Sequence, residues 1–165
     1  MVRLKVDGDG DLRQLPSKID ATTVLQALRS TTIPKNVDRK NIRKDSNVAV
    51  RSATFGALSR GNAPARVSEI ARRRPILCEL LARFGRSLLR DDFAFASIQL
   101  NVSYEAKMHV DASNDGPSAI IALGDFRGGE LWTVASSRAA GCSKSSTATN
   151  RTAPSPSKAT ENATL

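Results

Sequence analysis

Apolar residues recur at helical spacing in two stretches of the chain. The first follows Asp20, a residue suited to capping a helix, and predicts a short helix that begins near Ala21 and ends before Pro34. The second begins at Pro75, where a first-turn proline is tolerated, and has one apolar stripe: Ile76, Leu77, Leu80, Leu81, Phe84 and Leu88. Each stripe needs a sheet or another helix to cover it.

Strand-like patterns flank the second predicted helix. The run 48–58 predicts a strand before the Gly61-Asn62 turn. From Asp92 onward the pattern predicts short strands near 93–100, 104–111, 118–123 and 130–134, separated by turn residues, and the run at 118–123 is typical of a strand buried on both faces. We therefore expect an α+β fold in which an antiparallel β-sandwich or barrel begins after residue 91.

The two ends of the chain carry little apolar pattern. Residues 1–20 contain a Gly-Asp alternation at 7–11 that lacks the closing glutamate of a calcium loop, and they predict a flexible terminus. Residues 134–165 are rich in Ser, Thr and Ala and predict a disordered tail, because they cannot bury enough apolar surface to offset chain entropy. Between them we expect one domain at 21–133, with a mainly helical, basic support at 21–90 and a β-core at 91–133.

Charge is unevenly distributed along the chain. The net charge is +9, yet residues 1–90 carry a balance of +11 and residues 91–133 a balance of −5. An acidic segment suits a cation such as a metal ion, whereas a phosphate backbone would meet the basic half. No signal peptide and no membrane-length apolar run is present, so we expect an intracellular protein, cytoplasmic or nuclear, that does not bind membranes.

The acidic segment holds the only histidine of the chain, in His109-Val110-Asp111. On a β-strand, side chains two residues apart point to the same face, so one face would present an imidazole and a carboxylate. An isolated pair of this kind is common by chance. Its neighbours give it weight: Asn101 and Tyr104 upstream, then Asn114-Asp115-Gly116-Pro117-Ser118 and the stretch GDFRGGELW.

In these motifs the chain resembles the iron(II)- and 2-oxoglutarate-dependent dioxygenases, over about residues 93–133. The closest likeness is to the branch that holds prolyl 4-hydroxylases and nucleic-acid-oxidising enzymes. The resemblance implies a double-stranded β-helix, a jelly-roll-like fold, with helices packed on it. It also implies Fe(II) and 2-oxoglutarate as cofactors, His109 and Asp111 as metal ligands, and Asn101 and Tyr104 as contacts to 2-oxoglutarate.

The chain departs from that family in two ways. The family uses a second histidine as a metal ligand, and His109 is the only histidine here. It also uses a downstream arginine or lysine to pair with 2-oxoglutarate, and the downstream Arg138 and Arg151 lie in low-complexity sequence. We therefore expect a dioxygenase truncated after the first part of an incomplete core, inactive as written, whose complete form hydroxylates a C–H bond of a protein, a nucleic acid or a small molecule.

Two alternatives remain open from the sequence. One is a basic nucleic-acid-binding module without catalytic activity, in which the contacts to phosphates come from Arg72, Arg73, Arg74, Arg83, Arg86 and Arg90. The other is a complete protein that binds metal with an outside ligand or as an oligomer.

Overall fold

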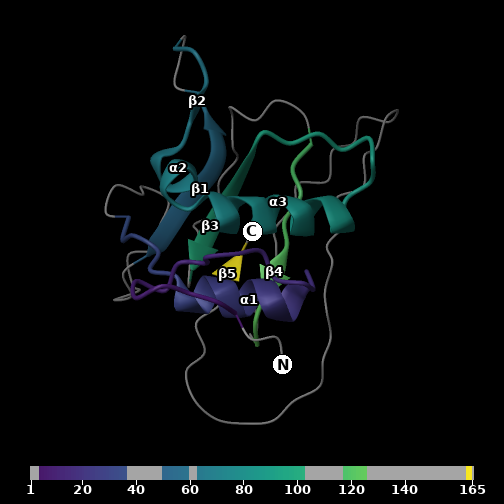
Figure 1. The fold of residues 1–165 in the computed structure, drawn as a ribbon. Helices are drawn as coiled ribbons and strands as arrows, with labels where there is room; N and C mark the ends of the chain where they lie inside the picture. Colours follow the sequence, from purple (N-terminus) through teal and green to yellow (C-terminus); the bar gives the residue numbers. More distant parts are fainter. Residues whose placement is uncertain (1–3, 37–49, 60–62, 103–116, 126–162, 165) are drawn as a thin grey trace, which may run out of the picture.

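The computed structural model describes residues 4–36, 50–59, 63–102, 117–125 and 163–164. These residues form an α+β structure, as predicted, in which two helices lie in front of a sheet in the view of Figure 1. The helices are α1 (Ala21–Ser30), α2 (Glu69–Arg73) and α3 (Pro75–Leu88). The strands are β1 (Arg51–Leu58), β2 (Arg66–Val67), β3 (Ser97–Val102), β4 (Ala122–Leu123) and β5 (Ala163–Thr164).

Helix α1 begins where the sequence predicts. The Asp20 carboxylate caps it by accepting a hydrogen bond of 2.8 Å from the Thr23 backbone N–H, which satisfies one of the unpaired donors of the first turn. Lys18 lies 2.8 Å from the same carboxylate. The hydrogen bonds from Lys18 and Thr23 lower the pKa of Asp20 from 3.8 to about 2. The charged cap is therefore retained well below neutral pH.

Helix α3 confirms the second helical prediction, with Pro75 in its first turn. Most of its apolar stripe packs inward, where Leu77, Leu80, Leu81 and Phe84 are buried, whereas Leu88 at its end is 44% exposed. The facing residues come from α1, from β1 and β3, and from the stretch around β4. They are Val24, Ala27, Leu28, Ala53, Phe55, Leu100, Ile121 and Leu123. One hydrophobic core thus lies between the helices and one face of the sheet.

The sheet has the strand order β2-β1-β3-β5-β4 and every neighbouring pair is antiparallel. The pairing of β1 with β3 is the longest and runs from Arg51 opposite Val102 to Gly56 opposite Ser97. Because β5 is antiparallel to both β3 and β4, these two strands run parallel to each other. Residues 103–121 therefore join two parallel strands of one sheet.

The first part of the chain differs from the flexible terminus expected for residues 1–20. Residues 4–20 make defined contacts: Val6 and Leu12 form a β-bridge, and Leu12 is buried. The Asp7 carboxylate accepts hydrogen bonds from the backbone N–H groups of Asp9 and Asp11, so the Gly-Asp alternation builds a tight turn. Asp11 in turn lies 2.6 Å from Arg74 at the start of α3.

Several strands are shorter than the patterns predict. The strand predicted at 48–58 is present from Arg51, whereas the one predicted from Phe93 begins at Ser97. Phe93 and Phe95 lie outside the strands, and Arg86 of α3 stacks over the Phe95 ring at 5.2 Å. In the run 118–123 only Ala122–Leu123 is a strand. There Ile120 is 40% exposed while Ile121 is 9% exposed, so burial on both faces is not observed.

Of the segment 134–165 the structure describes only Ala163 and Thr164, so the disorder predicted for the rest of it lies outside the described residues. Ala163 and Thr164, within the segment 134–165 for which composition predicts disorder, form β5. Backbone pairing on both sides of these residues does not depend on apolar side chains, which is why composition does not reveal it. The strands predicted at 104–111 and 130–134 lie outside the described residues. None of the helices within the described ranges has the length and apolar character needed to cross a bilayer.

Candidate functional site

Asn101 is the one sequence-predicted site residue that the structure describes. It lies near the end of β3, opposite Ser52 of β1. Tyr104, His109 and Asp111 lie outside the described residues. The geometry around the candidate site is therefore that of β1 and β3 and their side chains.

The two faces of the β1–β3 pair differ in chemistry. Side chains alternate between faces along a strand, so the register places Ala53 with Leu100, and Phe55 with Ile98, toward the helices. The register places four polar side chains on the opposite face: Ser52, Thr54, Gln99 and Asn101. We refer to these four residues as the polar row.

Hydrogen bonds link the polar row across the two strands. The Thr54 hydroxyl donates to Gln99 Oε1 at 2.5 Å, and Gln99 Nε2 donates to Asn101 Oδ1 at 3.3 Å and to the Leu100 carbonyl at 3.0 Å. At one end of the row, Asn36 Nδ2 donates to the Ser52 hydroxyl at 2.9 Å. These contacts fix which way both β3 amides face.

The polar row is only partly open to solvent. Ser52 is 6% exposed, and Thr54, Gln99 and Asn101 are half-buried. Half-buried hydroxyl and amide groups can donate hydrogen bonds to a polar ligand and accept them from it. Because these side chains are already held in place by one another, less conformational entropy is lost when a ligand binds. No member of the row is charged. The row fits the orientation of a ligand by hydrogen bonds, and it supplies no cation to pair with a carboxylate.

The residues on either side of the His109-Val110-Asp111 motif are anchored in one sheet. Val102 ends β3 opposite Ala163, and Leu123 of β4 also lies opposite Ala163, so the two positions are level in the sheet. Two parallel strands cannot be joined by a tight turn and require a crossover connection. Helices α1 and α3 cover the apolar face of the sheet (Figure 1), so within the described residues the face that carries the polar row is the one without a helix on it.

The described residues do not assemble a metal centre by themselves. Within the stretches that the structure describes, no three His, Cys, Asp or Glu side chains are grouped closely enough to hold a metal ion. The predicted ligands His109 and Asp111 are not among these stretches. The polar row offers neutral hydroxyl and amide groups, which can hydrogen-bond a polar ligand.

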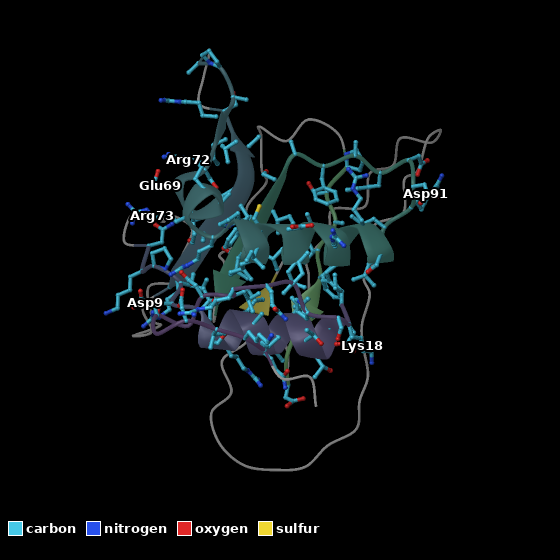
Figure 2. All side chains as sticks on the ribbon, viewed as in Figure 1. Asp9, Lys18, Glu69, Arg72, Arg73 and Asp91 are labelled. Carbon is cyan, nitrogen blue, oxygen red and sulfur yellow. The ribbon has the colours of Figure 1, made fainter. Side chains whose placement is uncertain are left out.

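The six arginines predicted to contact phosphates all have intramolecular partners. Arg74 is held most firmly, 17% exposed, between Asp11 at 2.6 Å and the Thr32 carbonyl at 2.7 Å. Arg72 and Arg73 both pair with Glu69, and these three side chains project from the outer side of α2 (Figure 2). Arg83 pairs with Glu79 and Arg90 with Asp92, while Arg86 stacks on Phe95. Arg74 therefore has a structural role, and the other five lie at the surface.

Three members of the polar row were not predicted from the sequence: Ser52, Thr54 and Gln99. A signal for them exists, since polar residues at 52 and 54 alternate with Ala53 and Phe55, and polar residues at 99 and 101 alternate with Ile98 and Leu100. The alternation places each pair on one strand face. That the two pairs face each other depends on the β1–β3 register, which the alternation does not give.

Comparison of the whole chain with models of protein families, with curated proteins and with solved structures gives no match.

Proposed function

We propose that this chain carries the first part of the core of an iron(II)- and 2-oxoglutarate-dependent dioxygenase, with the polar row as one wall of its substrate and co-substrate cavity. The observation that carries the proposal is the two-faced β1–β3 pair. One face is apolar and packs against α1 and α3, and the other presents Asn101 within a hydrogen-bonded row. This arrangement suits a sheet that has helices on its outside and a polar site on its inside.

The strand topology supports a jelly-roll-like core. In a Greek key a late strand returns to pair with an early one, and a jelly roll combines two such keys. Here β5, from the end of the chain, lies between β3 and β4. The crossover from β3 to β4 would supply a strand to a second sheet over the polar row, and His109 and Asp111 belong to that crossover. We therefore propose an incomplete double-stranded β-helix as the finer description of the fold.

In the proposed site, two residues bind the metal and two contact the co-substrate. His109 and Asp111 would supply two of the three metal ligands, since imidazole nitrogen and carboxylate oxygen suit iron(II). Asn101, held by Gln99, would orient the co-substrate by hydrogen bonding, with Tyr104 beside it. When bound, the iron and 2-oxoglutarate would let molecular oxygen hydroxylate a C–H bond, with one oxygen atom going to the substrate and the other to the succinate that forms from 2-oxoglutarate with loss of CO2. The third ligand cannot be a histidine of the same chain, because the chain has one.

Metal binding tests the proposal directly. The full chain is titrated with Mn(II) under anaerobic conditions and free metal is followed by electron paramagnetic resonance, then Fe(II) and 2-oxoglutarate are added and the visible charge-transfer band is recorded. We expect His109→Ala and Asp111→Ala each to weaken metal binding at least tenfold, since each removes a direct ligand. Asp115→Ala, a carboxylate in the same segment, is the matched control and should bind as the wild type does.

The same titration tests the polar row through the affinity for 2-oxoglutarate. We expect Asn101→Ala to weaken 2-oxoglutarate binding and leave Mn(II) binding unchanged, because Asn101 contacts the co-substrate and not the metal. Equal metal affinity in the wild type, His109→Ala and Asp115→Ala would refute the proposal.

A further inference from the structure

The hairpin formed by β1 and β2, together with α2, exposes three arginines within eight residues. Arg66 lies on β2, and Arg72 and Arg73 lie on α2, with only Ser68 between the two elements. Arg66 is exposed, and the side chains of Arg72 and Arg73 are 64% and 76% exposed. We refer to Arg66, Arg72 and Arg73 as the arginine surface.

The arginine surface stands on rigid structure. The Ser68 side chain caps α2 by accepting a hydrogen bond from the Ala71 N–H at 3.2 Å, and the Ser68 N–H donates to the Gly56 carbonyl of β1 at 2.8 Å. Ala71, on the opposite side of α2 from the solvent, is buried in the core. The helix therefore cannot rotate its arginines inward, and they remain at the surface next to the projecting hairpin (Figure 1).

The charge of this surface is only partly neutralised inside the molecule. Among the described residues, Glu69 is the carboxylate that pairs with both Arg72 and Arg73, and its side chain is 55% exposed. Exposed pairs of this kind contribute little to stability, so a stronger anion can replace the carboxylate at small cost. Because Arg72 and Arg73 pair with the same carboxylate, their guanidinium groups lie close together. Two neighbouring guanidinium groups can bind a doubly charged anion or two successive charges of a repeating anion.

We infer that the arginine surface binds the phosphate backbone of a nucleic-acid duplex, independently of sequence. An acidic protein partner would require large apolar anchor residues in a pocket, and the exposed large apolar side chains of the hairpin are Leu58 and Val67 alone. A single strand would require aromatic platforms for base stacking, and the one aromatic residue of the hairpin, Phe55, is 1% exposed. Charged contacts to phosphates require neither feature. The inference goes beyond the proposed oxygenase function and does not depend on iron.

The test measures salt-dependent binding of the full chain to a short, fluorescently labelled DNA duplex by anisotropy. Three phosphate contacts predict a slope of about −2.7 for log affinity against log salt, or about 40-fold weaker binding between about 50 and 200 mM salt. We expect the triple variant Arg66→Ala, Arg72→Ala, Arg73→Ala to lose most of this slope and at least tenfold in affinity at the lower salt concentration. Circular dichroism establishes that the variant is folded.

The matched control removes the same charge from α3 and the residues after it, in the triple variant Arg83→Ala, Arg86→Ala, Arg90→Ala. Its slope should stay within about one unit of the wild type. Equal losses in the two triple variants would show that binding follows net charge, and would overturn the inference. So would the absence of duplex binding by the wild type, or equal binding to poly-glutamate or to anionic phospholipid vesicles.

A second variant tests the surface without removing any arginine. Glu69→Gln deletes the carboxylate that competes with phosphate for Arg72 and Arg73 and keeps a helix-forming side chain at that position. We expect duplex binding to tighten several-fold. Unchanged or weaker binding would contradict the role of Arg72 and Arg73. Because this readout needs no metal, its failure leaves the metal titration of His109 and Asp111 unaffected.

Discussion

Replacing Gly56 with alanine should destabilise the fold strongly, because Gly56 sits in β1 with a φ of +103°. A side chain is rarely compatible with that backbone conformation, and the strain costs about 1–3 kcal/mol. The added Cβ would also lie 2.4 Å from the backbone oxygen of Ala96, so the two strands must separate locally. That oxygen accepts a hydrogen bond of 2.9 Å from the Ala57 N–H, whose loss adds about 0.5–1.5 kcal/mol.

Together these terms predict that Gly56→Ala lowers the free energy of unfolding by about 1.5–4.5 kcal/mol. Urea denaturation followed by circular dichroism measures the change, with the slope of the transition expected to stay constant. Gly8→Ala is the matched control, because a Cβ at Gly8 meets nothing within 4 Å. It should change stability by less than about 1 kcal/mol. Equal midpoints for the two variants would refute the assignment of strain to Gly56.

Three further predictions concern the core, the first helix cap and the N-terminal turn. Leu80→Ala, at a fully buried position facing α1 and the sheet, should cost about 2–5 kcal/mol in urea denaturation, and a cost near zero would contradict the core described above. Asp20 has its pKa lowered to about 2, so its charge contributes stability above its ordinary pKa of 3.8 and that contribution is lost as pH falls from about 4 to 2. Asp20→Asn, which keeps a capping side chain, should flatten the dependence of melting temperature on pH in that interval, and an unchanged profile would rule out this cap as its source. Arg74→Ala leaves Asp11 without its partner and should lower the free energy of unfolding by about 1–3 kcal/mol. Arg73→Ala removes one side of an exposed ion pair and should lower it by less than about 1 kcal/mol. Similar losses of stability for the two variants would show that the burial of the Arg74 pair does not make it more important.

Local signals in the sequence were sufficient to predict α1 and α3, whereas the five-residue α2 was not predicted. The cap at Asp20 and the proline at position 75 mark helix starts by satisfying or removing first-turn donors, and the apolar spacing marks the buried stripe. Both signals depend on residues within a few positions of each other. For that reason α1 and α3 could be predicted from the sequence, and the structure confirms both.

The pairing of strands that are far apart in the sequence could not be predicted from local signals. The polar row requires Thr54 to lie opposite Gln99, a match 45 residues apart along the chain, and alternation alone allows several registers. The order of the N-terminal turn likewise depends on Arg74 reaching Asp11 across more than sixty residues. The candidate ligands His109 and Asp111 stay predictions, since they lie outside the described residues.

The β1–β3 pair also has a consequence for how the chain folds. Closing a loop of about 45 residues to bring Thr54 beside Gln99 costs on the order of 3 kcal/mol in chain entropy before any strand contact is gained. Helices α2 and α3 lie inside that loop and form from local contacts. Formation of α3 before the strands pair would shorten the flexible part of the loop and present an apolar surface on which β1 and β3 can meet. We therefore expect the rate of folding to depend on the stability of α3, and the strand pairing to complete later.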